Sequence, residues 1–177
     1  LKAFFGIVFI TFSSFLIISI ITYSSSDPGL GKLYSDKEIL NIFGFIGAIS
    51  SSFTLGVLGL LSLLILFYIF YSGFIIILGL KIQFLFLKFI LVFISSIFLN
   101  LSLALQKIEF IESGLLSKLL LDILNYYFSI ISINFLYKNL ISLFLVISAL
   151  LILIYCFSIK FNFFLNILKK ILMVFIL

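Results

Sequence analysis

The side chains that could take part in chemistry are few. The chain contains no His, and its one cysteine, Cys156, lies inside an apolar run where we expect a small buried hydrophobe. Ser-His and Cys-His nucleophilic sites and the common transition-metal sites therefore lack the residues they need. The candidate carboxylates form three groups: Asp27, then Asp36 with Glu38, then Glu109, Glu112 and Asp122.

The first two carboxylate groups fit turn and capping roles. Asp27 precedes Pro28 in an Asp-Pro-Gly sequence, which is typical of a turn. Asp36 and Glu38 lie in a Ser-x-x-Glu pattern that begins at Ser35, a capping box that predicts the start of a short helix. Neither group requires a catalytic explanation.

The third group favours a solvated rim over a proton relay. Glu109, Glu112 and Asp122 lie beside lysines and outside the long apolar runs, whereas transport normally leaves ionisable groups at membrane depth. Serines within the apolar runs could line a pore, but they do not align as one polar stripe, which favours helix packing. We therefore predict no catalytic residue, no cofactor-binding residue and no metal site.

Composition places the chain in a membrane. It is 65% hydrophobic and only 10% charged, whereas soluble domains are about one-quarter charged. A domain of this length must still present a large polar surface to water, which excludes a water-soluble fold. The basic residues are all lysines and are scattered between apolar runs, so we predict no direct contact with nucleic acid.

Four long apolar runs predict transmembrane helices, because each can cross a hydrocarbon layer of about 30 Å. They cover residues 3–23, 53–80, 85–105 and 140–159. The expected fold is an all-α membrane protein in a single domain, 1–177. The short connection between the second and third runs predicts that these two helices are antiparallel neighbours, with Lys88 extending to the interface.

Polar and amphipathic segments separate these runs. Residues 24–52 form a predicted outer loop, and residues 106–139 form a predicted outer amphipathic segment. Within the latter, polar residues recur at helical spacing from Gly114 to Ile133, which favours a helix in the plane of the interface. Residues 160–177 form a predicted cytoplasmic interfacial segment, because Lys169 and Lys170 would be costly at mid-membrane.

Lysine placement predicts the topology. One side holds six lysines and no acidic residue: Lys2, Lys81, Lys88, Lys160, Lys169 and Lys170. Every Asp and Glu lies on the other side. The positive-inside rule therefore predicts that the lysine-only side, with both termini, is cytoplasmic.

Small residues mark one end of the second run. Gly56 and Gly59 lie near one another on a helical surface, where the missing side chains would let another helix approach closely. No Lys-Ser or Lys-Thr follows them, so they are not a phosphate-binding loop.

The exit of the first run resembles a known family. Its loop has the residues Ser24, Ser26, Asp27 and Pro28, and similar loops open the FtsK/SpoIIIE family of bacterial DNA translocases. The resemblance continues at family spacing through Asn41, Gly44, Gly47 and Gly59, and more weakly at Gly114. It departs at Ser117, where the family usually has a glycine.

This resemblance implies a membrane anchor and assembly module. In such proteins a four-span N-terminal region at the division septum of the inner membrane contacts other division proteins and anchors a hexameric ATPase, which moves DNA in chromosome segregation. No Gly-x-x-x-x-Gly-Lys-Ser/Thr loop occurs here, so hydrolysis is not expected of these residues. A chain that begins with Leu1 and ends in an apolar run is expected to be part of a longer product. The alternative is a small multi-pass transporter or channel subunit.

Overall fold

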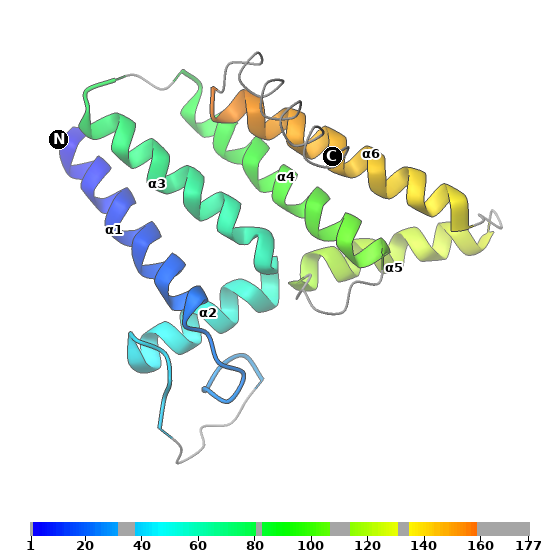
Figure 1. Cartoon of the computed structure of the whole chain (residues 1–177), viewed down its shortest axis with the longest axis horizontal. Helices are drawn as coiled ribbons and strands as arrows, with labels where there is room; N and C mark the ends of the chain where they lie inside the picture. The colour runs from blue at the N-terminus through cyan, green and yellow to red at the C-terminus, as the bar shows by residue number, and fades with distance from the viewer. Residues whose placement is uncertain (1, 32–37, 81–82, 107–113, 131–134, 159–177) are drawn as a thin grey trace, which may run out of the picture.

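The computed structural model describes residues 2–31, 38–80, 83–106, 114–130 and 135–158. It is built from helices, as predicted (Figure 1). They are α1 (Lys2–Ile21), α2 (Gly44–Leu58), a short 3-10 turn η1 (Leu60–Ser62), α3 (Leu63–Ile77), α4 (Leu85–Leu105), α5 (Gly114–Ile130) and α6 (Phe135–Cys156).

Four helical segments are long and apolar enough to cross a membrane, which confirms the predicted all-α class with four spans. They are Lys2–Ile21, Leu60–Ile77, Leu85–Leu105 and Tyr137–Cys156. The second differs from the expected continuous run 53–80, because residues 53–58 belong to α2 and the crossing segment begins after Gly59. Gly59 has a φ of 81° and a ψ of 176°, which no helix accommodates.

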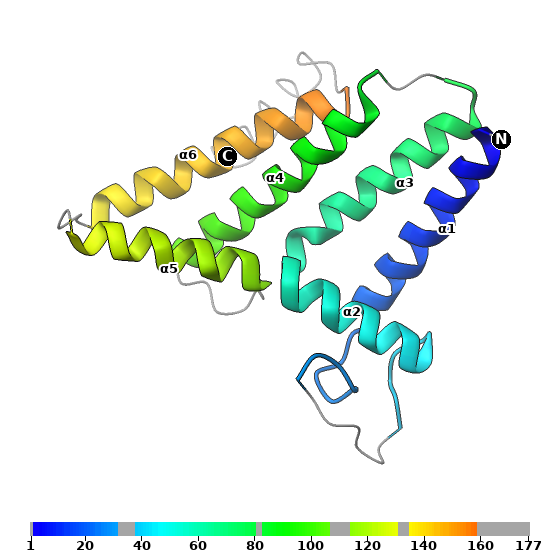
Figure 2. The same cartoon turned by 180° about the vertical axis from the view of Figure 1, so that it is seen from behind.

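The spans pack as two antiparallel pairs. α1 lies along α3, and α4 lies along α6, while α3 and α4 contact each other less extensively (Figures 1 and 2). The neighbouring placement predicted for the second and third spans is therefore present, but each has a closer partner. α2 and α5 lie across the bundle at the end opposite the start of α1 (Figures 1 and 2).

Two buried clusters lie between the helices. One joins α3, α4 and α6 through Tyr68, Val92 and Cys156, and the other joins α1, α2 and α3. Large apolar side chains face outward instead of being collected inside, as Phe86 and Phe144 illustrate. This distribution is typical of helices surrounded by lipid, because hydrocarbon imposes no cost on an exposed aromatic ring.

The amphipathic pattern predicted for 114–133 is present in α5. Lys118, Asp122, Asn125 and Ser129 are all exposed, whereas Ser117 and Phe128 are buried.

Other predictions fall partly or wholly on residues that the structure does not describe. These are the capping box at Ser35, the carboxylates Glu109 and Glu112, and the interfacial segment 160–177. Residues 38–43 are described and are not helical.

Candidate functional site

Asp27 fastens the first loop to the chain that enters α2. Its two carboxylate oxygens accept hydrogen bonds from the backbone N–H groups of Leu40 and Asn41, each at 2.9 Å. The side chain is only 3% exposed, and its bond to Asn41 is buried. Asp27 therefore does more than shape a turn. It joins the first loop to two residues that lie thirteen and fourteen positions later in the chain.

The residues before Asp27 form a local turn. The hydroxyl groups of Ser24 and Ser26 are 2.7 Å apart, and the N–H of Asp27 donates to the carbonyl oxygen of Ser24 at 3.2 Å. Pro28 is buried directly after them. The four loop residues predicted as a motif therefore lie together, at the exit of α1.

Asn41 connects the end of α1 with the start of α2. Its amide nitrogen donates to the carbonyl oxygen of Ser19 at 2.8 Å, and its amide oxygen accepts from the N–H of Phe43 at 3.1 Å. A methyl group placed on Gly47 would overlap this amide oxygen. Gly44, which begins α2, has a φ of 60°, a conformation that favours glycine. These contacts bring three residues together at the start of α2: Asn41, Gly44 and Gly47.

The break at Gly59 is stabilised from α4. The Asn100 amide donates to the carbonyl oxygen of Leu58 at 2.8 Å, and the Ser96 hydroxyl donates to the carbonyl oxygen of Leu61 at 2.9 Å. A helix end leaves such carbonyls without intrahelical partners, and Ser96 and Asn100 are buried where they supply the donors. Two polar side chains of one neighbouring span therefore satisfy the backbone on both sides of the break.

Gly114 meets the same break from α5. A methyl group on it would overlap the amide nitrogen of Gly59 and lie 2.9 Å from the Gly59 Cα. Gly114 also has a φ of 74°. Gly56 differs, because it is exposed and the nearest atom to a methyl placed there is a terminal carbon of Leu30 at 3.3 Å. Of these glycines, Gly59 and Gly114 lie backbone against backbone.

The family model described as the 4TM region of DNA translocase FtsK/SpoIIIE matches residues 1–171 of the chain. The chain belongs to this family. No curated protein and no solved structure gives a match.

In this FtsK/SpoIIIE region, one close contact between spans was not predicted. Gly6 in α1 and Gly73 in α3 face each other, and a methyl on either would lie 2.8 Å from the carbonyl oxygen of the other. The available signal was one glycine in the first apolar run and several in the second. That signal does not say which helix each glycine faces.

A second unpredicted feature of the FtsK/SpoIIIE region is the burial of Lys88. The prediction placed it at the interface but did not anticipate that it is only 8% exposed, with its ammonium group donating to the Ser158 hydroxyl at 2.9 Å. Cys156 lies beside it, fully buried, with its thiol 3.5 Å from the Lys88 carbonyl oxygen.

The contacts given above hold helices and loops of the described part of the chain together. Among these residues no group of three or more His, Cys, Asp or Glu side chains lies close enough to hold a metal ion. Asp27, the most buried described carboxylate, has both oxygens occupied by backbone donors. The site is therefore a set of loop and interhelical contacts at the end of the bundle where α2 and α5 lie.

Proposed function

We propose that this chain is the membrane anchor and assembly module of a bacterial DNA translocase that acts in chromosome segregation at cell division. The observation that carries the proposal is the family match over residues 1–171. We further propose that ATP hydrolysis and DNA movement belong to another segment of the translocase, because this sequence contains no phosphate-binding loop.

The polar side chains within the spans favour an anchor over a conduction path. The Ser95 hydroxyl donates to the carbonyl oxygen of Ala149 at 3.0 Å, and Ser96 and Asn100 bond the backbone around Gly59. These groups join α4 to α6, η1 and α2. No Asp or Glu occurs in any of the four spans, whereas ion and proton pathways commonly use such residues.

We propose an inner-membrane orientation with both termini in the cytoplasm. Lys2 and Lys88 lie at the end of the bundle where α1 starts and α6 ends, while Asp27, Lys118 and Asp122 lie at the other end. This distribution fits the positive-inside rule. By family resemblance the proposed partners are other division proteins at the septum and further copies of the chain, as a hexamer in the full-length translocase.

The test is the behaviour of the chain fused to a fluorescent reporter in dividing cells. We expect membrane insertion and enrichment at the septum. Uniform membrane fluorescence in a correctly inserted fusion would contradict the assembly role.

Purified chain in liposomes tests the transporter or channel alternative. We expect no nucleotide hydrolysis and no ion flux above an empty-liposome control. Flux that is abolished by Asp27→Ala but retained in the exposed control Asp122→Ala would overturn the anchor proposal in favour of transport.

A further inference from the structure

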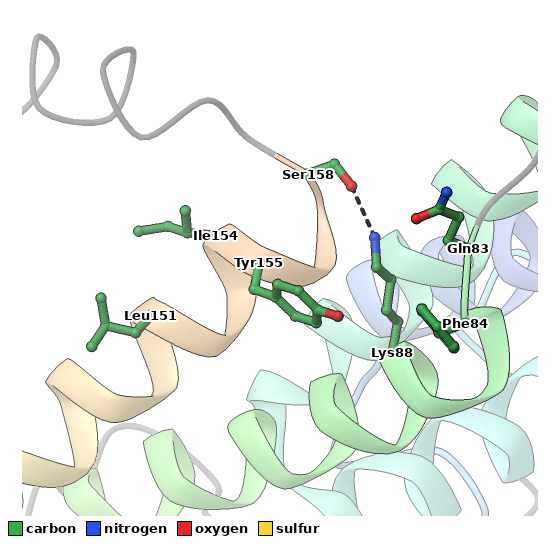
Figure 3. Close-up of a pocket in the computed structure, with 7 residues that line it drawn as sticks. All are labelled: Gln83, Phe84, Lys88, Leu151, Ile154, Tyr155 and Ser158. Atoms are coloured by element: carbon green, nitrogen blue, oxygen red, sulfur yellow. Dashed lines mark hydrogen bonds between the residues drawn. The ribbon is translucent and has the colours of Figure 1, made fainter.

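A cavity of about 500 Å³ lies between the start of α4 and the end of α6. Its polar wall is formed by Gln83, Lys88 and Ser158, and its apolar wall includes Leu151 and Ile154. Figure 3 shows Lys88 reaching from α4 toward Ser158, with Tyr155 beside it. The cavity is thus bounded by a cation at one side and hydrocarbon side chains at the other.

The charge in this cavity lacks a counter-ion among the described residues. Lys88 is 8% exposed, its ammonium bonds the neutral Ser158 hydroxyl, and it lies 5.4 Å from the centre of the Tyr155 ring. An ammonium group has three donors, and a buried charge is costly unless it is paired. The described carboxylates are Asp27, Glu38 and Asp122, in the first loop and α5 at the opposite end of the bundle.

The apolar wall continues along the outer face of α6. Leu151 is 54% exposed, and the exposed side chains Ile147, Phe144, Leu143 and Leu140 follow it at helical spacing toward the other end of the helix. A ligand that suits both walls has an anionic head and a hydrocarbon tail. Basic pockets between transmembrane helices commonly bind lipid head groups of this kind.

The backbone at the cavity mouth is also unusual. Phe84 and Ser158 both line the cavity and have φ values of 55° and 53°, and they are the described non-glycine residues with positive φ. For a bulky residue such as Phe84 this conformation is strained, and such strain gathers at binding sites. Phe84 also immediately precedes α4, whose positive N-terminal end adds to the attraction for an anion.

We propose that this cavity binds an anionic phospholipid, with its phosphate at the Lys88 ammonium and an acyl chain against Leu151 and Ile154. The ligand supplies a counter-ion that the described residues lack, and it covers exposed apolar surface. A free phosphate ion would supply the counter-ion but would leave the apolar surface uncovered. This site is independent of the proposed role in cell division, since it requires only the bilayer.

Tryptophan fluorescence provides a local test, because the chain contains no Trp. The reporter is Leu151→Trp, and its matched control is Phe12→Trp, which replaces a side chain 53% exposed on α1, a helix that does not line the cavity. Each variant is placed in bilayers that contain phosphatidylglycerol or phosphatidylcholine with brominated acyl chains. Bromine quenches a tryptophan only when the lipid lies beside it.

At Leu151→Trp we expect phosphatidylglycerol to associate about fivefold more strongly than phosphatidylcholine, the effect of one lysine near an anionic head group. At Phe12→Trp, away from the cavity, we expect no preference. Equal association of the two lipids at both reporters would overturn the proposal. Because this comparison leaves Lys88 unchanged, it does not depend on a Lys88 variant that folds.

Substitution of Lys88 then identifies the binding group. In the Leu151→Trp chain, Lys88→Gln should remove the preference, Lys88→Arg should keep it, and the exposed control Lys118→Gln should leave it unchanged. An undiminished preference in Lys88→Gln would overturn the assignment. Excess inorganic phosphate at constant ionic strength should not compete; loss of the preference in its presence would instead indicate a simple anion site.

Discussion

The side-chain amide of Asn100 in α4 donates a hydrogen bond of 2.8 Å to the backbone carbonyl oxygen of Leu58, the last residue of α2. Asn100 is fully buried, so water does not compete for this bond. The contact joins the helix that lies across the bundle to a span forty-two residues later in the chain.

Removal of this amide should destabilise the bundle. We expect Asn100→Leu to lower the free energy of unfolding by about 1–2 kcal/mol, because the Leu58 carbonyl would remain buried without a donor. Unfolding by SDS in mixed micelles, followed by circular dichroism, measures the change. The matched control is Asn125→Leu, at an exposed position of α5. Equal stability of the two variants would contradict the structural role of the bond.

The two glycines at the end of α2 should respond differently to substitution. Gly59→Ala forces a side chain into a φ of 81° and should cost about 1–3 kcal/mol in the same unfolding measurement. Gly56→Ala places its methyl group only near the flexible end of Leu30 and should be close to neutral. If Gly56→Ala proved the more damaging, the position of the helix break would be wrong.

The contact between α1 and α3 should depend on Gly6. Gly6→Leu would drive a side chain into the Gly73 carbonyl and Ile77, and we expect a loss of about 1–3 kcal/mol from overpacking. Ala3→Leu is the control, since Ala3 lies on the same helix and is exposed. Similar unfolding curves for the two variants would show that the helices do not approach at Gly6.

Asp27 should contribute to stability without contributing to a reaction. Asp27→Ala leaves the buried N–H group of Asn41 without its acceptor and removes the partly buried bond to Leu40, which should cost about 1–3 kcal/mol. Asp27→Asn keeps one acceptor oxygen and should cost less. Asp122→Ala, at an exposed position, is the control for loss of a carboxylate. A stability unchanged by Asp27→Ala would contradict the loop connection.

The proposed orientation predicts which loops can be labelled from outside the cell. In a Cys156→Ala chain, a membrane-impermeant thiol reagent should label Ser26→Cys on intact cells and leave Gln83→Cys unlabelled. Both parent residues are exposed, so access to the bulk solvent on each side decides the outcome. The reverse pattern would show that the lysine-rich end faces outward, against the positive-inside rule.

The sequence alone determined the membrane class, the number of spans and the amphipathic character of α5. These properties follow from the chain's own residues, since transfer of an apolar run into lipid and the spacing of a polar stripe are local quantities. The bounds of α4 coincide with the predicted 85–105 for the same reason. The turn at Asp27 was predicted, whereas its hydrogen bonds to Leu40 and Asn41 were not.

Only the tertiary structure decided which helix faces which. A glycine in an apolar run permits a break or a close approach, and its neighbours in space determine which of these occurs. Gly59 ends α2 where Asn100 and Ser96 can satisfy the freed carbonyls, and Gly6 finds Gly73 because α1 lies along α3. The burial of Lys88 likewise depends on the end of α6, seventy residues away. Such contacts depend on the relative rotation and position of whole helices, which no local pattern contains.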